Sequence, residues 1–314
     1  MKAIHLIAPS GASLDEKSPL AGIGWLKAQG IAVQNLECVK RVHERFAGTD
    51  ELRLAELNAL AKLDPEMTVM AMRGGYGIHR ILPNIDWVGI AKSIADGLQV
   101  CGHSDFTAFQ LGLLAKTGAV TLAGPMLNYD FGRMDETGNA ITPNEFMWQY
   151  FQKAIQNRKL DCTVSAPQAF LGKSDSGSLA GILWGGNLTV LAGLVGTPYL
   201  PSLQQSKNGI LFLEDVNEHP YRIERMLMQL LDAGLLSNQS AILLGSFSAY
   251  RLYENDRGYS LERAIEAIRK RLSDAIPILT DLPFGHQANK LTLPVGAQAS
   301  LDYSASSFTL KANW

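Results

Sequence analysis

Residues 98–116 read LQVCGHSDFTAFQLGLLAK, and this stretch decides the fold. Its apolar start, Leu98–Cys101, predicts a short buried strand. The strand runs into a turn at residues 102–104 and then directly into a helix with an apolar stripe that includes Phe106, Phe109 and Leu113. A strand followed at once by a helix is the repeating unit of a parallel sheet covered by helices.

The same alternation of strands and helices extends over the first half of the chain. The helix over Thr49–Leu63 is the clearest, because Thr49 or Asp50 can cap it and leucines recur along one face. We therefore predict an α/β fold with a mainly parallel sheet. The other predicted elements are strands at Ala3–Ala8, Ile31–Leu36, Met67–Met72 and Ala119–Leu122, and a helix at Leu20–Gln29.

Beyond about residue 160 the pattern changes to shorter strands punctuated by glycine. We predict two domains: an N-terminal α/β domain over 1–158, which carries the strand–turn–helix stretch, and a smaller β-rich α/β C-terminal domain over 159–314. The tail from Lys290 to Lys311 alternates like a β-meander. The other predicted elements of this half are strands at Cys162–Ala166, Gly177–Leu183, Ile210–Leu213 and Ala241–Gly245, and helices from Pro220 to Gly234 and over Leu261–Leu272.

Composition excludes several classes of protein. The chain has 314 residues, 46% of them hydrophobic, which is enough for a full core. Its 28 basic and 30 acidic residues nearly balance, so we expect neither nucleic acid nor a membrane surface as partner. Three cysteines without a CxxC pair favour a reducing compartment and no zinc cluster. The short N-terminal apolar run, broken by His5, does not resemble an export signal.

One uncharged segment, Ser176–Ser206, has the length of a membrane span. Six glycines and two prolines interrupt it. We therefore predict buried strands and a glycine-rich turn there.

The turn at residues 102–104 has the pattern of a nucleophile elbow. Such a turn lifts the Ser104 hydroxyl above the end of the sheet and places it at the N-terminus of a helix. The backbone N–H of Asp105 could then bind an oxyanion. Phe106 stands where the second glycine of the GxSxG pattern would be, and Ser104 or Asp105 could instead be an ordinary helix cap.

A glycine-rich loop, Arg73-Gly-Gly-Tyr-Gly77, follows the strand Met67–Met72. Glycine lets backbone N–H groups approach a ligand closely, so this loop could supply a second oxyanion donor or hold a phosphate. It matches neither GxGxxG nor a P-loop, and a plain strand–helix turn is an equal alternative.

Two further segments carry candidates for acid–base chemistry. Glu214 and Asp215 end a strand, where carboxylates can point into a cleft, although Asp215 also suits a capping role. His286 follows a glycine in a loop and could act as a base near neutral pH. Ser104, Glu214 and His286 together provide a nucleophile, a base and a carboxylate to orient that base.

These motifs together resemble the LD-carboxypeptidase family of serine peptidases, the muramoyltetrapeptide carboxypeptidases. The resemblance covers nearly the whole chain, in a fixed order. Its motifs are Ile7-Ala-Pro-Ser10, Met72-Arg-Gly-Gly-Tyr-Gly77, Gly102-His-Ser-Asp-Phe-Thr107, Gly185-Gly-Asn-Leu188, Phe212-Leu-Glu-Asp215 and Gly285-His286.

The resemblance implies a site between the two domains, with Ser104 as nucleophile, His286 as base and Glu214 as its orienting partner. It implies an oxyanion hole from the N–H groups of Asp105 and Gly75. The implied reaction releases the terminal D-alanine from a murein tetrapeptide during peptidoglycan recycling in the cytoplasm. The family resemblance also implies a homodimer that needs no cofactor, and no metal site is expected.

Three residues are candidates for substrate binding. Arg73 is the nearest cation in the sequence for the free carboxylate of D-alanine. Trp184 and Asn187 could line the cleft, and Trp184 could equally belong to the core.

Three alternatives stay open at this point. Microcin-immunity peptidases share the resemblance but cleave a peptidyl-nucleotide, for which aromatic stacking on the base is expected. An α/β-hydrolase esterase has the same Ser, Glu, His order, although Phe106 counts against it. A non-catalytic binding protein for a small ligand would place Gly74 and Gly75 at its cleft.

Overall fold

The first of two sheets contains the strands predicted for the first half of the chain. The computed structural model describes residues 1–165, 170 and 174–314. This sheet has the order β11-β5-β4-β3-β1-β2, in which β1 to β5 pair in parallel. The predicted parallel α/β sheet is confirmed. Its strands are β1 (Ala3–Ile7), β2 (Ala32–Gln34), β3 (Thr68–Ala71), β4 (Gln99–Gly102), β5 (Thr121–Ala123) and β11 (Leu293–Val295).

The second sheet is larger and mixed, with the order β10-β9-β8-β7-β12-β13-β6. Strands β7 to β10 pair in parallel, and β7, β12, β13 and β6 pair antiparallel. The prediction of a β-rich α/β second half is confirmed. Its strands are β6 (Lys159–Ser165), β7 (Gly177–Asn187), β8 (Gly209–Val216), β9 (Gln239–Ser248), β10 (Ile278–Leu279), β12 (Gln298–Tyr303) and β13 (Ser307–Asn313).

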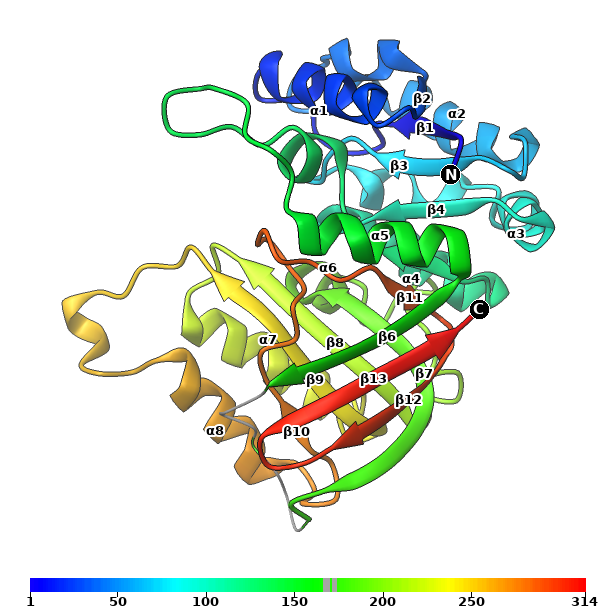
Figure 1. Cartoon of the computed structure of the whole chain (residues 1–314). Coiled ribbons are helices and arrows are strands. Elements are labelled where there is room, and N and C mark those ends of the chain that lie inside the picture. The colour runs from blue at the N-terminus through cyan, green and yellow to red at the C-terminus, as the bar shows by residue number, and fades with distance from the viewer. Residues whose placement is uncertain (166–169, 171–173) are drawn as a thin grey trace.

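Figure 1 shows α5 running between the upper and lower sheet and, among the described residues, one face of β6, β12 and β13 in the second sheet without a helix over it. The cap predicted for α2 is present, since Thr49 Oγ1 accepts a hydrogen bond from Leu52 N–H. The α-helices are α1 (Lys17–Ala28), α2 (Asp50–Ala59), α3 (Trp87–Asp96), α4 (Thr107–Thr117), α5 (Glu145–Asn157), α6 (Leu188–Gly193), α7 (Pro220–Asp232) and α8 (Leu261–Arg271). Short 3-10 turns lie at Leu36–Lys40, Leu60–Lys62, Ile78–Arg80, Leu82–Asn84, Ser104–Phe106 and Glu254–Asp256, and a single π-helical turn, η6, at Leu127–Phe131.

The C-terminal tail differs from the predicted meander. Strands β12 and β13 form the expected antiparallel pair, but β11 leaves them and pairs antiparallel with β5 of the first sheet. All three residues of β11 are buried, so this segment is covered on both faces, and its Pro294 is tolerated because β11 is an edge strand. The division at residues 158 and 159 stays a prediction, with one strand of the second half completing the first sheet.

Helix α4 lies at the junction of the two halves. Every residue from Thr107 to Leu114 is buried, because α4 packs against α3 on one side and against α6 and β7 of the second half on the other. The apolar stripe recognised in the sequence is therefore only part of the buried surface. The helix behind Ser104 is held by both halves of the chain.

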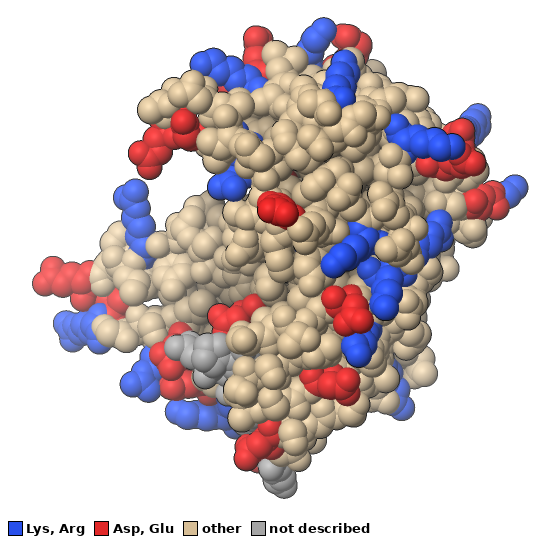
Figure 2. Space-filling view, viewed as in Figure 1, with Lys and Arg blue, Asp and Glu red and all other residues tan. Residues whose placement is uncertain are grey.

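The uncharged segment Ser176–Ser206 forms β7 and helix α6, so the prediction of buried strands and a turn omitted a short helix. Among the residues that the structure describes, no helix combines the length and the apolar character needed to cross a membrane. On the face drawn in Figure 2, basic and acidic side chains are interspersed, and a hollow lies between the upper and lower parts.

Gly181 in β7 tests how closely the second sheet is packed. A Cβ added at Gly181 would lie 2.0 Å from the carbonyl oxygen of Asn208, a backbone atom that cannot rotate away. We expect Gly181→Ala to lower the free energy of unfolding by about 1–3 kcal/mol, as overpacking does. The matched control is Gly24→Ala in α1, where a Cβ meets nothing within 4 Å, so a gain of about 0.5–1 kcal/mol is expected. Equal effects in urea denaturation would contradict this packing.

Candidate active site

Ser104 occupies a strained turn between β4 and α4. Its φ of 63° lies in the left-handed region, which a residue with a side chain adopts only where its surroundings enforce it. Two glycines make room for this turn. A Cβ on Gly102 would lie 2.6 Å from the Phe106 ring, and one on Gly74 would lie 2.6 Å from Ser104 Oγ. The glycine-rich loop after β3 therefore lies directly against the serine hydroxyl.

The side-chain carboxylate of Asp105 holds the Ser104 turn in place. It is buried and accepts hydrogen bonds from Ser10 Oγ at 2.7 Å and from Ile78 N–H at 3.1 Å. Burial raises the pKa of this carboxyl. These bonds tie the Ser104 turn to the segment that follows β1 and to the 3-10 turn that follows the glycine-rich loop. Asp105 thus has a positioning role for its side chain, in addition to the role predicted for its backbone.

Two backbone donors near the serine are free. In the described part of the chain, neither Asp105 N–H nor Gly75 N–H donates to a protein acceptor. A Cβ on Gly74 would lie 3.2 Å from Asp105 N, so the glycine-rich loop and the start of α4 converge here. An oxyanion between them would meet donors that need no rearrangement.

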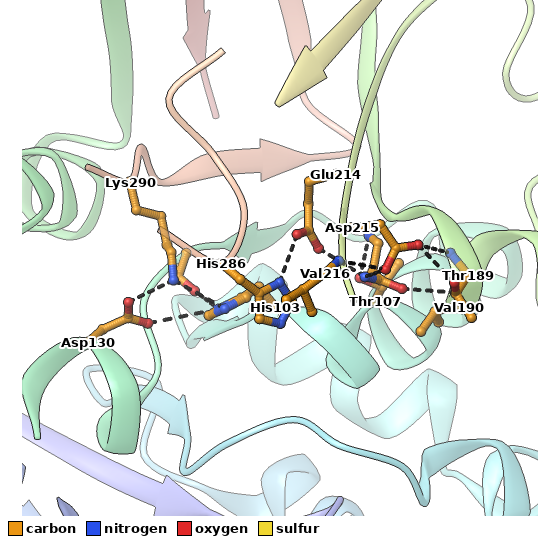
Figure 3. A network of polar contacts seen from close by, with 12 residues as sticks. His103, Thr107, Asp130, Thr189, Val190, Glu214, Asp215, Val216, His286 and Lys290 are labelled. Carbon is orange, nitrogen blue, oxygen red and sulfur yellow. Dashed lines mark hydrogen bonds and ion pairs between the residues drawn. The ribbon is translucent and has the colours of Figure 1, made fainter. Parts of the chain in front are cut away.

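His286 and Glu214 are joined by a hydrogen bond, although 72 residues separate them in the chain. His286 Nδ1 donates to Glu214 Oε2 at 2.8 Å, as Figure 3 shows. Glu214 lies near the C-terminal end of β8 and is fully buried, while the His286 side chain is 24% exposed. The carboxylate can only accept, so the proton sits on Nδ1 and Nε2 keeps a free lone pair.

Ser104 and His286 face one cavity of about 560 Å³ between the two halves. Among the described residues, the Ser104 hydroxyl makes no hydrogen bond with His286. Such bonds are often absent before substrate binds. The cavity is lined by Arg73, Gly74, Gly75, His103, Ser104, Met126, Tyr129, Asp130, Arg133, Val216, Asn217, His286, Gln287, Ala288 and Lys290.

Of the three residues predicted to bind substrate, Trp184 and Asn187 do not line the cavity, so the prediction that they line the cleft is wrong. Trp184 is fully buried, donates from Nε1 to Gln239 Oε1 at 2.9 Å, and is a core residue rather than part of the cavity wall. Asn187 lies behind Glu214 and donates from Nδ2 to its carboxylate at 3.2 Å. Arg73 does line the cavity, where Ala12 O accepts from its Nη1 at 2.7 Å.

Asp215 has the structural role that the sequence favoured for it. It accepts hydrogen bonds from Asn187 Nδ2, from Thr189 N–H and from Thr189 Oγ1 at 2.8–3.0 Å. Burial raises the pKa of this carboxyl. Its side chain anchors the start of α6 and does not line the cavity.

A buried polar group beside His286 was missed in the sequence. Lys290 Nζ donates to Asp130 Oδ1 at 2.7 Å and to His103 Nε2 at 3.1 Å (Figure 3). His103 Nδ1 in turn donates to Gly124 O at 2.9 Å. Nothing in the local sequence links residues 160 positions apart, and only the fold brings them together. No cluster of three or more potential metal ligands occurs among the described residues.

These features define a class of protein. A serine at a strand–helix turn, a histidine bonded to a buried carboxylate, and a cavity that both share are the features of serine hydrolases. Family models identify the particular family: the LD-carboxypeptidase N-terminal domain matches residues 4–124, and the LD-carboxypeptidase C-terminal domain matches residues 180–301. The chain belongs to the LD-carboxypeptidase family and is a serine carboxypeptidase.

Similar proteins agree with this assignment. The crystal structure of a muramoyltetrapeptide carboxypeptidase from Oxalobacter formigenes has a TM-score of 0.86 and 39% identity, covering 100% of this chain and 99% of that one. A murein tetrapeptide carboxypeptidase from Pseudomonas aeruginosa is 29% identical over 304 residues, covering 95% of this chain and 92% of the relative. The microcin C7 self-immunity protein MccF of Escherichia coli is 26% identical over 307 residues, covering 90% and 84%.

The fold also resembles that of MccF in its wild-type apo state, with a TM-score of 0.82 and 23% identity over 100% of this chain and 96% of that one. The family assignment sets aside two alternatives from the sequence, the α/β-hydrolase esterase and the non-catalytic binding protein.

The buried His103 predicts how stability depends on pH. Burial, and next the nearby Lys290 cation, hold the pKa of His103 well below the usual 6.5. The unfolded chain therefore takes up a proton below about pH 6.5 that the folded chain does not. This histidine's contribution to stability is complete above that pH and declines below it, by up to about 1.4 kcal/mol per pH unit. We expect His103→Gln to flatten the unfolding free energy between about pH 6.5 and 5, and parallel profiles for variant and wild type would contradict this.

Proposed function

We propose that this carboxypeptidase hydrolyses the L,D-peptide bond that precedes the terminal D-alanine of a murein tetrapeptide. Ser104 is the nucleophile, His286 the general base and Glu214 its orienting partner. One observation carries the proposal: the histidine that Glu214 orients shares a cavity with a serine held in a left-handed turn. Relatives named for murein peptides supply the substrate class.

The proposed mechanism begins with proton transfer from Ser104 Oγ to His286 Nε2 as the oxygen attacks the carbonyl carbon before D-alanine. Glu214 keeps the Nδ1 proton in place and stabilises the imidazolium. The tetrahedral oxyanion accepts hydrogen bonds from Asp105 N–H and Gly75 N–H. His286 then protonates the leaving amine, D-alanine departs, and a water molecule deprotonated by His286 hydrolyses the acyl-enzyme. No cofactor is needed for these steps.

Arg73 is the proposed partner of the substrate's terminal carboxylate. It lines the cavity together with Gly74 and Gly75, next to the serine. Its guanidinium is anchored by Ala12 O and lies 5.6 Å from the centre of the Tyr129 ring. A guanidinium held on two sides is well placed to bind a carboxylate through its remaining donors. We place this reaction in cytoplasmic peptidoglycan recycling and expect a homodimer, as the family resemblance implies.

A second candidate substrate is a peptidyl-nucleotide. MccF is both a sequence relative and a structural neighbour, and its structure has been solved with aspartyl sulfamoyl adenosine. In this chain Tyr129 lines the cavity and is 45% exposed, so its ring is available for stacking on a base. The 39% identity to a muramoyltetrapeptide carboxypeptidase favours the murein peptide.

Mass spectrometry of a murein tetrapeptide incubated with the purified protein tests the reaction. Wild type should remove one D-alanine, and Ser104→Ala should reduce kcat by about 10⁴-fold or more, as loss of a serine nucleophile does. Glu214→Gln, with the wrong hydrogen-bonding pattern toward Nδ1, should cause a loss of about 10⁴-fold. Turnover by Ser104→Ala at the wild-type rate would exclude the serine mechanism. Cleavage of an aspartyl sulfamoyl nucleoside alone would favour the second substrate.

Gly74→Ala tests the close approach of the glycine-rich loop. The new methyl group would lie 2.6 Å from Ser104 Oγ, so either the loop or the hydroxyl must move. A displacement of about 1 Å at a reacting group can reduce the rate about 100-fold, and we expect a loss of this order in kcat/KM. Thermal unfolding should show that the variant remains folded. Wild-type kcat/KM in Gly74→Ala would show that the loop does not confine the nucleophile.

A further inference from the structure

Lys290 is a buried cation for which the proposed mechanism has no use. It is 1% exposed, lies four residues after His286, and lines the cavity together with Gln287 and Ala288. Its ammonium bonds Asp130 of the η6 turn and His103 at the end of β4. Both partners belong to the first sheet and its connections. The His286 segment, in contrast, is linked to the second sheet by the hydrogen bond from His286 to Glu214.

Stability alone gives little reason for such a group. Removing an ammonium and a carboxylate from water is costly, and well-packed apolar side chains often serve a core equally well. Each member of the group is nevertheless hydrogen-bonded: Asp130 Oδ2 also accepts from Met126 N–H at 2.8 Å, and His103 Nδ1 donates to Gly124 O. A satisfied buried network of this kind specifies one arrangement of the segments that it joins.

The segments that it joins carry the proposed nucleophile and base. His103 immediately precedes Ser104, and its ring packs edge-on against the ring of His286, with centroids 5.2 Å apart and an interplanar angle of 70°. The backbone of the His286 segment closes on itself where Leu291 N–H donates to Pro283 O at 2.7 Å. Lys290 lies at this closure, and Figure 3 shows its bonds to Asp130 and His103 of the first half.

We propose that Lys290 is a positioning residue: by bridging Asp130 and His103, it holds the His286 segment of the second half at a fixed distance from the Ser104 turn of the first. This inference rests on the proposed roles of Ser104 and His286. It concerns neither substrate contact nor proton transfer by Lys290. Loss of the bridge leaves the Glu214–His286 bond intact but lets the imidazole move relative to the serine.

The test compares Lys290→Met, Asp130→Asn and the double variant. Methionine keeps the length of the side chain and removes the ammonium, and asparagine is nearly isosteric with aspartate. The matched control is Lys159→Met, which removes a lysine paired with Asp161 at 3.7 Å on strand β6, outside the cavity. Folded protein is quantified by thermal unfolding before each assay.

Two readouts are measured: kcat and KM for the murein tetrapeptide, and the rate at which a fluorophosphonate labels Ser104. We expect Lys290→Met to lower kcat and the labelling rate together by about 10- to 100-fold, with KM changed by less than about 2-fold. Asp130→Asn should show a smaller loss of the same kind. The double variant should be no slower than Lys290→Met, because one broken bridge cannot be broken again. Lys159→Met should match wild type.

Several outcomes would overturn the proposal. A folded Lys290→Met with wild-type kcat and labelling rate would show that the bridge does not position the site. An increase confined to KM would make Lys290 a substrate-binding residue instead. If Lys290→Met does not fold, an unchanged labelling rate in Asp130→Asn overturns it.

The labelling rate also separates this inference from the proposed function. A wild type that is labelled but does not cleave the tetrapeptide would contradict the murein substrate, while loss of labelling in Lys290→Met would still support the bridge. A wild type that is neither labelled nor able to cleave the tetrapeptide would contradict both, and if wild type cleaves without being labelled, an unchanged kcat in Lys290→Met overturns the bridge alone.

Discussion

The left-handed backbone of Ser104 is the constraint on which the rest of the site depends. A residue with a side chain occupies this conformation only when neighbouring groups hold it there. Here the buried Asp105 carboxylate does so through its bonds to Ser10 and Ile78, and Gly74 leaves the space that the hydroxyl needs. Ser104 then lines the cavity together with Gly74 and Gly75 of the glycine-rich loop. Hydrogen bonds from several elements thus stabilise the strained backbone of this one residue.

The proposed site also requires a base, and His286 comes from the other half of the chain. Glu214 lies near the end of β8 and is hydrogen-bonded to His286, while helix α4 that follows the Ser104 turn is buried by both halves. Strand β11 passes from the second half into the first sheet soon after Lys290, so the two halves share backbone pairing as well as side-chain contacts. Two independent domains joined by a linker would have to be positioned by substrate. In this chain the junction is built into the fold, and the cavity lies along it.

Some features followed from local sequence because their causes are local. The strand and helix around Ser104, the cap at Thr49 and the parallel sheet were predicted correctly, since apolar periodicity and capping act over a few residues. The pairing of Glu214 with His286 was expected from chemistry and family resemblance, and the structure places the two in contact. Predictions of which distant segments cover a helix or strand were less accurate. The apolar stripe on α4 underestimated its burial because the covering residues are distant in sequence.

By itself the sequence determined the kinds of group available: a serine after a strand, a glycine-rich loop, a carboxylate and a loop histidine, in an order that identifies the family. Only the tertiary structure decided which of them meet. It placed Trp184 in the core, Asn187 behind the carboxylate, and Lys290 between Asp130 and His103. The physical reason is that burial and hydrogen bonding depend on neighbours in space. A contact between residues 160 or 187 positions apart produces no local periodicity from which it could be predicted.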